Sequence, residues 1–319
     1  MVAPPTISRP EGVVAAVDVG SNSIKMTVAR SGSSGGFDEL ASASETVRLG
    51  IGIERSGRLA DDRVEAALAT LHRFAVDARA LGASRLLGVA TEAVRVATNG
   101  AEFLDRVHRE TGWSVRTIDG DEEADLTFRG LAVLVDTSGS LVAADIGGAS
   151  TEVIVAHDGV VAGARSLPIG SGRLTDRLVH HDPPTAAEVS ACRDAVRIAL
   201  DGLQSSGMAV PSGHATRLVV VGGTGEYLAR LIGAQPIDRS TVSRARDRLQ
   251  SIPAATLAVH LGIAEARARV LPSGVAAVQA LIDRIEPGRI EIARSGIRAG
   301  LLLQALTDTG AVSHKARSG

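Results

Sequence analysis

Two short segments of this chain contain the residue types that bind phosphate and metal ions. Residues 18–29 read DVGSNSIKMTVA and residues 145–156 read DIGGASTEVIVA, so that Asp, Gly, Ser, Val and Ala fall in the same register. Each segment follows an apolar run, and its glycines allow a sharp turn in which successive amide N–H groups converge on an anion. The polar residues would not help to bury a core. The repeat therefore indicates two turns built to hold something charged.

We expect the two turns to face each other as the walls of one phosphate clamp. Asp18 and Asp145 would repel a bare phosphate, which is consistent with a Mg²⁺ ion or its waters between carboxylate and phosphate. The alternative is a pair of hairpin turns in which glycine serves geometry alone, but the presence of two copies favours the clamp. The predicted phosphate-binding residues of the two turns are Gly20, Ser21, Asn22, Ser23, Gly147, Gly148, Ser150 and Thr151.

Two further segments could add phosphate ligands. Arg95 follows a predicted strand in ATEAVRVATNG (90–100), where a guanidinium can bind phosphate through two parallel hydrogen bonds. An arginine of this kind is more often a surface ion-pair partner. The segment VGGTGE (221–226) opens a predicted helix, so the amides of Gly223 and Thr224 could bind a phosphate at the helix N-terminus. Glycine turns like this one are common in α/β proteins, so the second signal is weak.

Acidic residues crowd the start of another predicted helix, in GDEEAD (120–125). The helix dipole favours carboxylates in the first turn, and this reading suffices for Asp121 and Glu122. From the pattern alone, Glu123 remains open between the same structural role and a role in chemistry.

The strands and helices expected from the sequence must position these residues. In residues 23–30 the apolar Ile24, Met26 and Val28 alternate with polar residues, which is the spacing of a strand, whereas residues 61–81 repeat apolar residues at helical spacing. Strands are predicted at 13–18, 23–30, 37–50, 84–95, 113–119, 141–145, 152–159, 160–168 and the start of 216–233. Helices are predicted at 61–81, 101–112, 120–135, 171–179, 185–204, the end of 216–233, 240–250, 265–284 and 297–308.

The composition argues against several classes of protein. The chain has 319 residues, enough for two domains, and its 34 basic and 36 acidic residues give a formal charge of -2. This balance argues against a duplex nucleic-acid binder, and aromatic residues at 2% argue against a stacking platform for single strands. The one cysteine, Cys192, is expected to be inert packing in a protein of the reducing cytoplasm. Apolar runs long enough for a membrane span are not found.

The order of the elements indicates an internal duplication in an α/β protein. Each half opens with three strands, the first of which ends in Asp, then Val or Ile, then Gly. We predict a flexible lead-in, two domains and a flexible tail, and we allow for the last helix packing back on the first domain. The predicted boundaries are 1–12 for the lead-in, 13–130 and 131–310 for the domains, and 311–319 for the tail.

Taken in order, these segments resemble the exopolyphosphatase and guanosine pentaphosphate phosphatase family (Ppx/GppA), within the actin, sugar kinase and Hsp70 superfold. The matching segments follow the family order from about residue 12 to 305. They are DVGSNSIKMTVAR (18–30), ATEAVRVATN (90–99), IDGDEEADLTFRG (118–130), DIGGASTEVIV (145–155), SLPIGSGRLTD (166–176), VVVGGTGEYLARL (219–231) and ARSGIRAGLL (293–302).

The resemblance implies two ribonuclease H-like domains with a cleft between them. It implies release of terminal orthophosphate from inorganic polyphosphate, and also from guanosine pentaphosphate, by Mg²⁺-dependent in-line attack of water. The family's catalytic glutamate falls on Glu123, as the base that orients the water, and Glu152 is the acid that closes the second phosphate motif. Asp145 falls on the metal-binding aspartate and Arg95 on the arginine that grips the phosphate. Lys25 falls where many members carry a basic residue facing the chain of phosphates.

The resemblance also implies cofactors and partners. The metal would be Mg²⁺, with Mn²⁺ as a substitute and a monovalent cation as an accessory ion. The substrate would be inorganic polyphosphate or guanosine pentaphosphate, and the protein would be a cytoplasmic homodimer. We expect no membrane partner and no specific nucleic acid.

Three features depart from the family pattern. Ala149 stands where members usually carry a third glycine, and if this residue needs a positive φ, alanine costs on the order of 1 kcal/mol. Ala299 stands where the family usually has a glutamate, so a supporting acid is missing. The matching region ends near residue 310, without the helical domains of the long members, which leads us to expect a preference for shorter chains.

Two alternatives to a phosphatase stay open. The first is a module that binds polyphosphate or a guanosine tetraphosphate-type alarmone without turning it over, which Ala149 and Ala299 would favour. The second is a kinase or ATPase of the same superfold, which would need an adenine pocket near the GGTG turn. Tight binding without phosphate release would select the first, and ADP formation from ATP would select the second.

Overall fold

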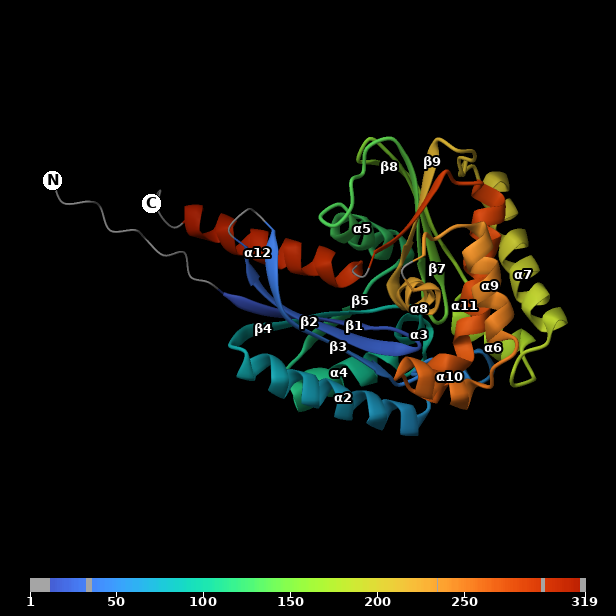
Figure 1. Ribbon diagram of the computed structural model, residues 1–319. Coiled ribbons are helices and arrows are strands. Elements are labelled where there is room, and N and C mark those ends of the chain that lie inside the picture. Colours follow the sequence, from blue (N-terminus) through green and yellow to red (C-terminus); the bar gives the residue numbers. More distant parts are fainter. Residues whose placement is uncertain (1–11, 33–35, 234, 294–295, 316–319) are drawn as a thin grey trace.

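The computed structural model describes residues 12–32, 36–233, 235–293 and 296–315, and it contains two five-stranded sheets with equivalent strand orders (Figure 1). The orders are β3-β2-β1-β4-β5 and β10-β9-β6-β7-β8. In each half the first three strands pair antiparallel, and the two later strands add in parallel beside the first. The duplicated ribonuclease H-like arrangement confirms the predicted α/β fold class of the actin, sugar kinase and Hsp70 superfold. The predicted lead-in and tail lie largely or partly outside the described residues.

The elements have the following bounds. The strands are β1 (Val13–Val19), β2 (Ser23–Ser31), β3 (Phe37–Thr46), β4 (Ala83–Ala90), β5 (Ser114–Thr117), β6 (Ser140–Ile146), β7 (Thr151–His157), β8 (Val160–Leu167), β9 (Thr216–Val221) and β10 (Arg289–Ala293). The helices are α1 (Ile53–Ser56), α2 (Asp61–Ala80), α3 (Glu92–Val96), α4 (Gly100–Thr111), α5 (Gly120–Leu131), α6 (Ser171–Leu178), α7 (Ala186–Ser205), α8 (Gly222–Ile232), α9 (Arg239–Leu249), α10 (Ala254–Leu261), α11 (Glu265–Ile285) and α12 (Ile297–Lys315).

Strand alternation places the two aspartates on facing surfaces. Side chains of a strand point alternately to its two sides, so Asp18 shares a face with Ala16, and Asp145 shares a face with Ala143. Ala16 packs in the cluster that α12 covers, and Ala143 packs in the cluster that α5 covers. Both of these faces look toward the middle of the molecule, and the outer faces are covered by α2 and α4 in one half and by α7 and α11 in the other.

The two inner helices are exchanged between the halves. The helix α5 comes from the first half, yet its Phe128 packs on the second sheet beside Ile154. The helix α12 comes from the end of the chain, yet its Leu302 packs on the first sheet beside Val14 (Figure 1). The helix that packs on the inner face of each sheet therefore comes from the other half. The contact between α5 and α12 links the two sheets.

Small residues let α5 and α12 approach until their backbones touch. A Cβ atom added to Gly130 would lie 2.2 Å from the carbonyl oxygen of Gly296 and 2.9 Å from the Cβ of Ala299. A Cβ added to Gly300 would lie 2.1 Å from the carbonyl oxygen of Leu126. The contact fixes α5, the helix that carries Glu123, against α12.

The structure departs from the expected elements at a few places. The strand expected at 84–95 ends at Ala90, and the residues after it form α3, which carries Arg95. The helix α10 and the strand β10 were not expected. Among the described residues, no helix is long and apolar enough to cross a membrane.

Candidate active site

The register of the central hairpins brings a charged residue opposite each aspartate. In the first half Asp18 of β1 lies opposite Lys25 of β2, and in the second half Asp145 of β6 lies opposite Glu152 of β7. The two turns are closed by the same hydrogen bond, since the amide of Gly20 donates to the carbonyl of Ser23 at 3.1 Å and that of Gly147 to Ser150 at 3.0 Å. The duplication seen in the sequence is thus a duplication of turn geometry.

A cavity of about 50 Å³ lies between the two turns. Most of the residues predicted from the repeat line it, and Glu123 of α5 lines it as well. The predicted residues found there are Asp18, Gly20, Ser21, Asn22, Ser23, Lys25, Glu123, Asp145, Gly147, Gly148, Ser150, Glu152 and Gly223. We call this space the central cavity.

The second turn is held in place by the start of α6. Amide groups in residues 170–173 donate to the carbonyl groups of Gly147, Gly148 and Ala149 at 2.8 to 2.9 Å. Because these carbonyls point at α6, the second turn and α6 are one unit, and the amide side of the turn is left to the central cavity.

The two turns touch each other at their tips. A Cβ atom added to Gly148 would lie 2.5 Å from the Cβ of Asn22 and 2.9 Å from its amide nitrogen. Only glycine fits this position without moving one of the turns. The side-chain amide Nδ2 of Asn22 is buried and has no hydrogen-bond partner, so it is a free donor beside the cavity.

Burial sets the charge of the facing aspartates. It raises the pKa of Asp18 and of Asp145, and the nearby cations Lys25 and Arg298 oppose this shift. The pKa of Lys25 is lowered by burial, although both aspartates act to raise it. The oxygen Oδ1 of Asp18 is buried, and no described residue forms a hydrogen bond with it. The nearby cations therefore do not fully offset the effect of burial on the two aspartates. A cation bound between them would stabilise their ionised forms.

Glu123 lies at the N-terminal end of α5, inside the central cavity. Asp119 caps this helix by accepting from the amide of Glu122 at 2.8 Å, which fixes the first turn. Glu123 is 5% exposed, and its Oε2 has no hydrogen-bond partner among the residues that the structure describes. Burial, together with the neighbouring carboxylate of Glu152, raises the pKa of Glu123 well above its ordinary value. An unpartnered carboxyl group aimed into a small polar cavity can accept a proton from a bound water once a nearby cation favours its ionised form.

Glu152 is also buried but has a partner. The hydroxyl of Ser166 on β8 donates to its Oε1 at 2.7 Å. Burial and the charge of Asp145 raise the pKa of Glu152, while the hydroxyls of Ser166 and Ser150 lower it. Its orientation is therefore set by the neighbouring strand, unlike that of Glu123.

A groove of about 490 Å³ adjoins the central cavity and shares Ser23, Lys25, Gly223 and Arg267 with it. We call it the front groove. Lys25, Arg267 of α11 and Arg298 of α12 line its inner end, and the groove is also lined by the acids Glu39, Glu45 and Glu226. Burial lowers the pKa of both guanidinium groups, and no carboxylate in the described part of the chain forms an ion pair with either.

These two arginines are held by groups other than carboxylates. Arg298 donates from Nη1 to the carbonyl of Met26 and to the hydroxyl of Thr27, both at 2.8 Å. The guanidinium of Arg267 lies 5.1 Å from the centre of the Tyr227 ring. Sequence reasoning assigned no role to either arginine, because a cation on a predicted helix is ordinarily a solvated residue.

Three predicted residues do not line the central cavity. The hydroxyl of Thr151 donates to the carbonyl of Ile169 at 3.1 Å, and that of Thr224 to Ile146 at 3.3 Å. Arg95 donates from Nη1 to the carbonyl of Ile118 at 2.5 Å, and its charge lowers the pKa of Glu123. The two hydroxyls form hydrogen bonds with backbone carbonyls next to the second turn. The guanidinium of Arg95 lowers the pKa of Glu123 without lining the cavity.

The two alanines that depart from the family pattern create no strain. Among the described residues other than glycine, only Arg48, Asp158 and Glu286 have a positive φ, so Ala149 needs no left-handed conformation. Ala299 is buried in the α5–α12 contact, where Gly130 leaves room for a methyl group only.

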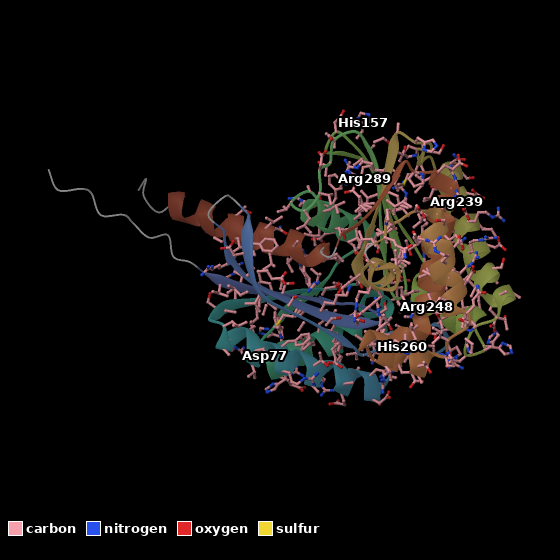
Figure 2. The ribbon with its side chains drawn as sticks, in the orientation of Figure 1. Asp77, His157, Arg239, Arg248, His260 and Arg289 are labelled. Carbon is pink, nitrogen blue, oxygen red and sulfur yellow. The ribbon has the colours of Figure 1, made fainter. Side chains whose placement is uncertain are left out.

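The described side chains do not form a complete metal cage. No group of three or more His, Cys, Asp or Glu residues among them is arranged to hold a metal ion. The labelled His157 and His260 lie at opposite ends of the second half, far from each other (Figure 2). Mg²⁺ commonly uses one or two carboxylates and completes its shell with water and substrate phosphates. Asp18 and Asp145, with their lack of positive charge, fit that pattern.

The chain is similar to known proteins of one family. The model of the Ppx/GppA phosphatase family matches residues 27–309 of the chain. The chain is 30% identical over 301 residues to exopolyphosphatase 1 of Mycobacterium tuberculosis, an alignment that covers 91% of this chain and 87% of that protein. It is 36% identical over 197 residues to exopolyphosphatase 2 of the same organism, covering 59% of this chain and 61% of that one.

Solved structures of similar proteins share the fold. A Ppx/GppA family member from Aquifex aeolicus has a TM-score of 0.74 at 26% identity, covering 94% of this chain and 99% of that one. An exopolyphosphatase from Cytophaga hutchinsonii has a TM-score of 0.81 at 23% identity, covering 93% of this chain and 98% of that one, which shows a common fold.

Proposed function

This chain belongs to the Ppx/GppA phosphatase family, and on that premise we propose that it is an exopolyphosphatase that releases terminal orthophosphate from inorganic polyphosphate. The observation that carries the proposal is the pairing of the two turns around the central cavity, with Glu123 inside it and a groove beside it that carries Lys25, Arg267 and Arg298. The terminal phosphoryl group would lie between the turns, in the central cavity that residues of both turns line.

Glu123 is the residue we propose as the base. Phosphoryl transfer to water depends mainly on positioning and on charge neutralisation, with little covalent chemistry for the protein to perform. In its ionised form the free Oε2 of Glu123 can accept a proton from the attacking water. Burial and the neighbouring carboxylates oppose ionisation, whereas Arg95 and a bound Mg²⁺ would favour it. Glu152 accepts a hydrogen bond from Ser166 at Oε1, which fixes its side chain, and we propose that it helps to position the terminal phosphate in the cavity.

The rest of the phosphate chain would bind in the front groove. Lys25, Arg267 and Arg298 lie at its inner end. Their charges act on nearby carboxylates, and they can also neutralise the phosphates that follow the terminal one. The same groove could receive the nucleoside end of guanosine pentaphosphate, since it has about 490 Å³ of space and Tyr227 on its wall. We therefore retain guanosine pentaphosphate as a second substrate.

Mg²⁺ is the cofactor we propose, with Asp18 and Asp145 as its protein ligands. When bound, the ion would neutralise phosphate oxygens and the two aspartates together. We also propose a homodimer and a cytoplasmic location, which follow from the resemblance to the family. Sedimentation of the purified chain would test the dimer.

Turnover is favoured over binding alone by two observations. The backbone of Ala149 is unstrained, and the carboxyl group of Glu123 is free and inside the cavity. A module that only binds would not need an unpaired buried glutamate, which is costly to keep.

Phosphate release with Mg²⁺ across tripolyphosphate, long polyphosphate, guanosine pentaphosphate and ATP tests the proposal. We expect release from the polyphosphates, and we expect Glu123→Ala to reduce it at least about 100-fold while the fold survives. Tight polyphosphate binding with no release by the parent chain would instead select a binding module. ADP formation from ATP as the main activity would select a kinase or ATPase.

A further inference from the structure

A second large cavity adjoins the central cavity on a different wall. It has a volume of about 410 Å³ and is lined by residues of both halves, including α1 and α3 of the first and α6 of the second. We call it the back cavity. It shares no lining residue with the front groove.

The wall between the back cavity and the central cavity consists of the two turns themselves. Ser21, Asn22, Gly148 and Ala149 line both spaces. At this wall Gly148 lies against Asn22, and glycine has no side chain to block the space. A small separation of the turns would join the two cavities.

The position of this wall is set by Arg173 of α6. Its guanidinium forms ion pairs with Glu54 at 2.6 Å and with Glu92 at 2.9 Å, both in the first half. The same guanidinium donates from Nη1 to the carbonyl of Ala149 at 3.0 Å. The contact between the two turns therefore depends on ion pairs that cross between the halves, and such pairs can break and re-form when the halves move.

The back cavity has guanidinium groups along its path to solvent. Arg48 pairs with Asp176 at 2.6 Å and Arg177 pairs with Glu54 at 2.8 Å. Arg55 is exposed and has no ion pair with a carboxylate in the described part of the chain. A small anion that enters this space meets a free cation at its outer end.

The front groove and the back cavity would be occupied by different ligands. If the protein hydrolyses polyphosphate as proposed above, the shortened polyphosphate remains in the front groove after each cleavage and blocks that opening. The orthophosphate that has just formed then lies between the turns, and the polyphosphate in the front groove prevents it from leaving on that side. We propose that orthophosphate leaves through the back cavity, past Arg55, when the contact between Asn22 and Gly148 opens. The next phosphate of the chain can then advance without the chain dissociating.

Blocking the back cavity tests this exit. Val96 and Ile51 line it and are 53% and 39% exposed, so that Val96→Trp or Ile51→Trp would fill its outer part without disturbing a core. Val76 on α2 is 54% exposed and does not line the back cavity, so Val76→Trp is the matched control. Two blocking variants guard against a folding defect in one of them, and thermal unfolding of each would be compared with the parent.

The measurement follows bond cleavage and phosphate release separately, by quenched flow and by a fluorescent sensor of free orthophosphate. With long polyphosphate, both blocking variants should cleave at the parent rate in the first turnover, release phosphate after a lag, and turn over about ten-fold more slowly. With tripolyphosphate the pyrophosphate product leaves the front groove and frees that opening, so turnover should stay within about two-fold of the parent.

Three results would overturn the exit. The first is phosphate release that remains simultaneous with cleavage in both blocking variants. The second is that these variants turn over tripolyphosphate as slowly, relative to the parent, as long polyphosphate. The third is that Val76→Trp slows turnover as much as the blocking variants do. A parent chain that releases no phosphate from any polyphosphate would instead refute the proposed function, and the exit with it.

Discussion

Glu123→Gln should inactivate the protein and stabilise it at the same time. In the folded chain this side chain is 5% exposed, its Oε2 has no partner, and its nearest charged neighbours include Glu152, Asp18 and Asp145. Burying an unpaired carboxylate among other carboxylates is unfavourable, whereas a buried amide of the same shape carries no charge. A residue kept only for stability would not be a glutamate here.

The size of the gain follows from proton linkage. The pKa of Glu123 is raised from 4.5 to about 10, first by burial and then by Glu152. The folded chain therefore binds this proton more tightly than the unfolded chain, so its stability is full below the unfolded pKa and falls as pH rises toward the folded one. One pH unit in this window is worth at most about 1.4 kcal/mol, so the gain from Glu123→Gln should grow as pH rises from about 6 to about 8, by no more than about 3 kcal/mol.

Urea unfolding of the parent and the variant, across the same pH series and without divalent cations, measures this difference. Glu122→Gln is the matched control, because Glu122 is the adjacent residue but is paired with Arg116, which lowers its pKa. That surface pair should change stability by less than about 1 kcal/mol. A gain from Glu123→Gln that does not depend on pH, or a variant that still releases phosphate at the parent rate, would refute the reasoning.

Three further outcomes are expected. Gly148→Ala would place a Cβ atom 2.5 Å from that of Asn22, so it should push the turns apart, displace the phosphate-binding groups and slow the cleavage step about ten-fold or more, with little change in unfolding temperature. Gly300→Ala would place a Cβ atom 2.1 Å from the carbonyl oxygen of Leu126, so urea unfolding should show a loss of about 1–3 kcal/mol; an unchanged stability would mean that α12 is free to shift. Glu39 is an exposed acid that lines the front groove, so Glu39→Gln should lower the KM for long polyphosphate about two- to five-fold and leave that for tripolyphosphate unchanged.

The turns could be predicted from the sequence because their signals are local. A strand that ends in Asp and Gly and is followed by hydroxyl residues specifies its own turn, and the repeat at 18–29 and 145–156 showed that the same geometry occurs twice. Alternation along the strands then fixes which face each aspartate occupies. The fold class was therefore accessible, and the structure confirms it.

The arginines of the front groove and the exchange of α5 and α12 could not be predicted from local patterns. Arg267 and Arg298 lie more than 200 residues from Lys25 along the chain, and only the tertiary fold brings the three to one groove. The apolar face of a helix shows that it packs on something, but it does not show which sheet it packs on. Hydroxyl residues pose a similar limit, since Thr151 holds a carbonyl of the backbone although its position in the turn suits a phosphate ligand.

The duplication explains why one cavity can hold both a water and a highly charged chain. Lys25 and Glu152 occupy equivalent positions, each opposite the aspartate of its own hairpin, yet one is a cation and the other an acid. Lys25 lines the front groove as well as the central cavity, whereas Glu152 lines the central cavity beside Glu123. Two lysines at these positions would attract phosphate on both sides and leave no acidic side for the water. Two glutamates would repel the chain. The difference between the two copies thus gives the site a direction, with the phosphate chain on the side of Lys25 and the attacking water on the side of Glu123.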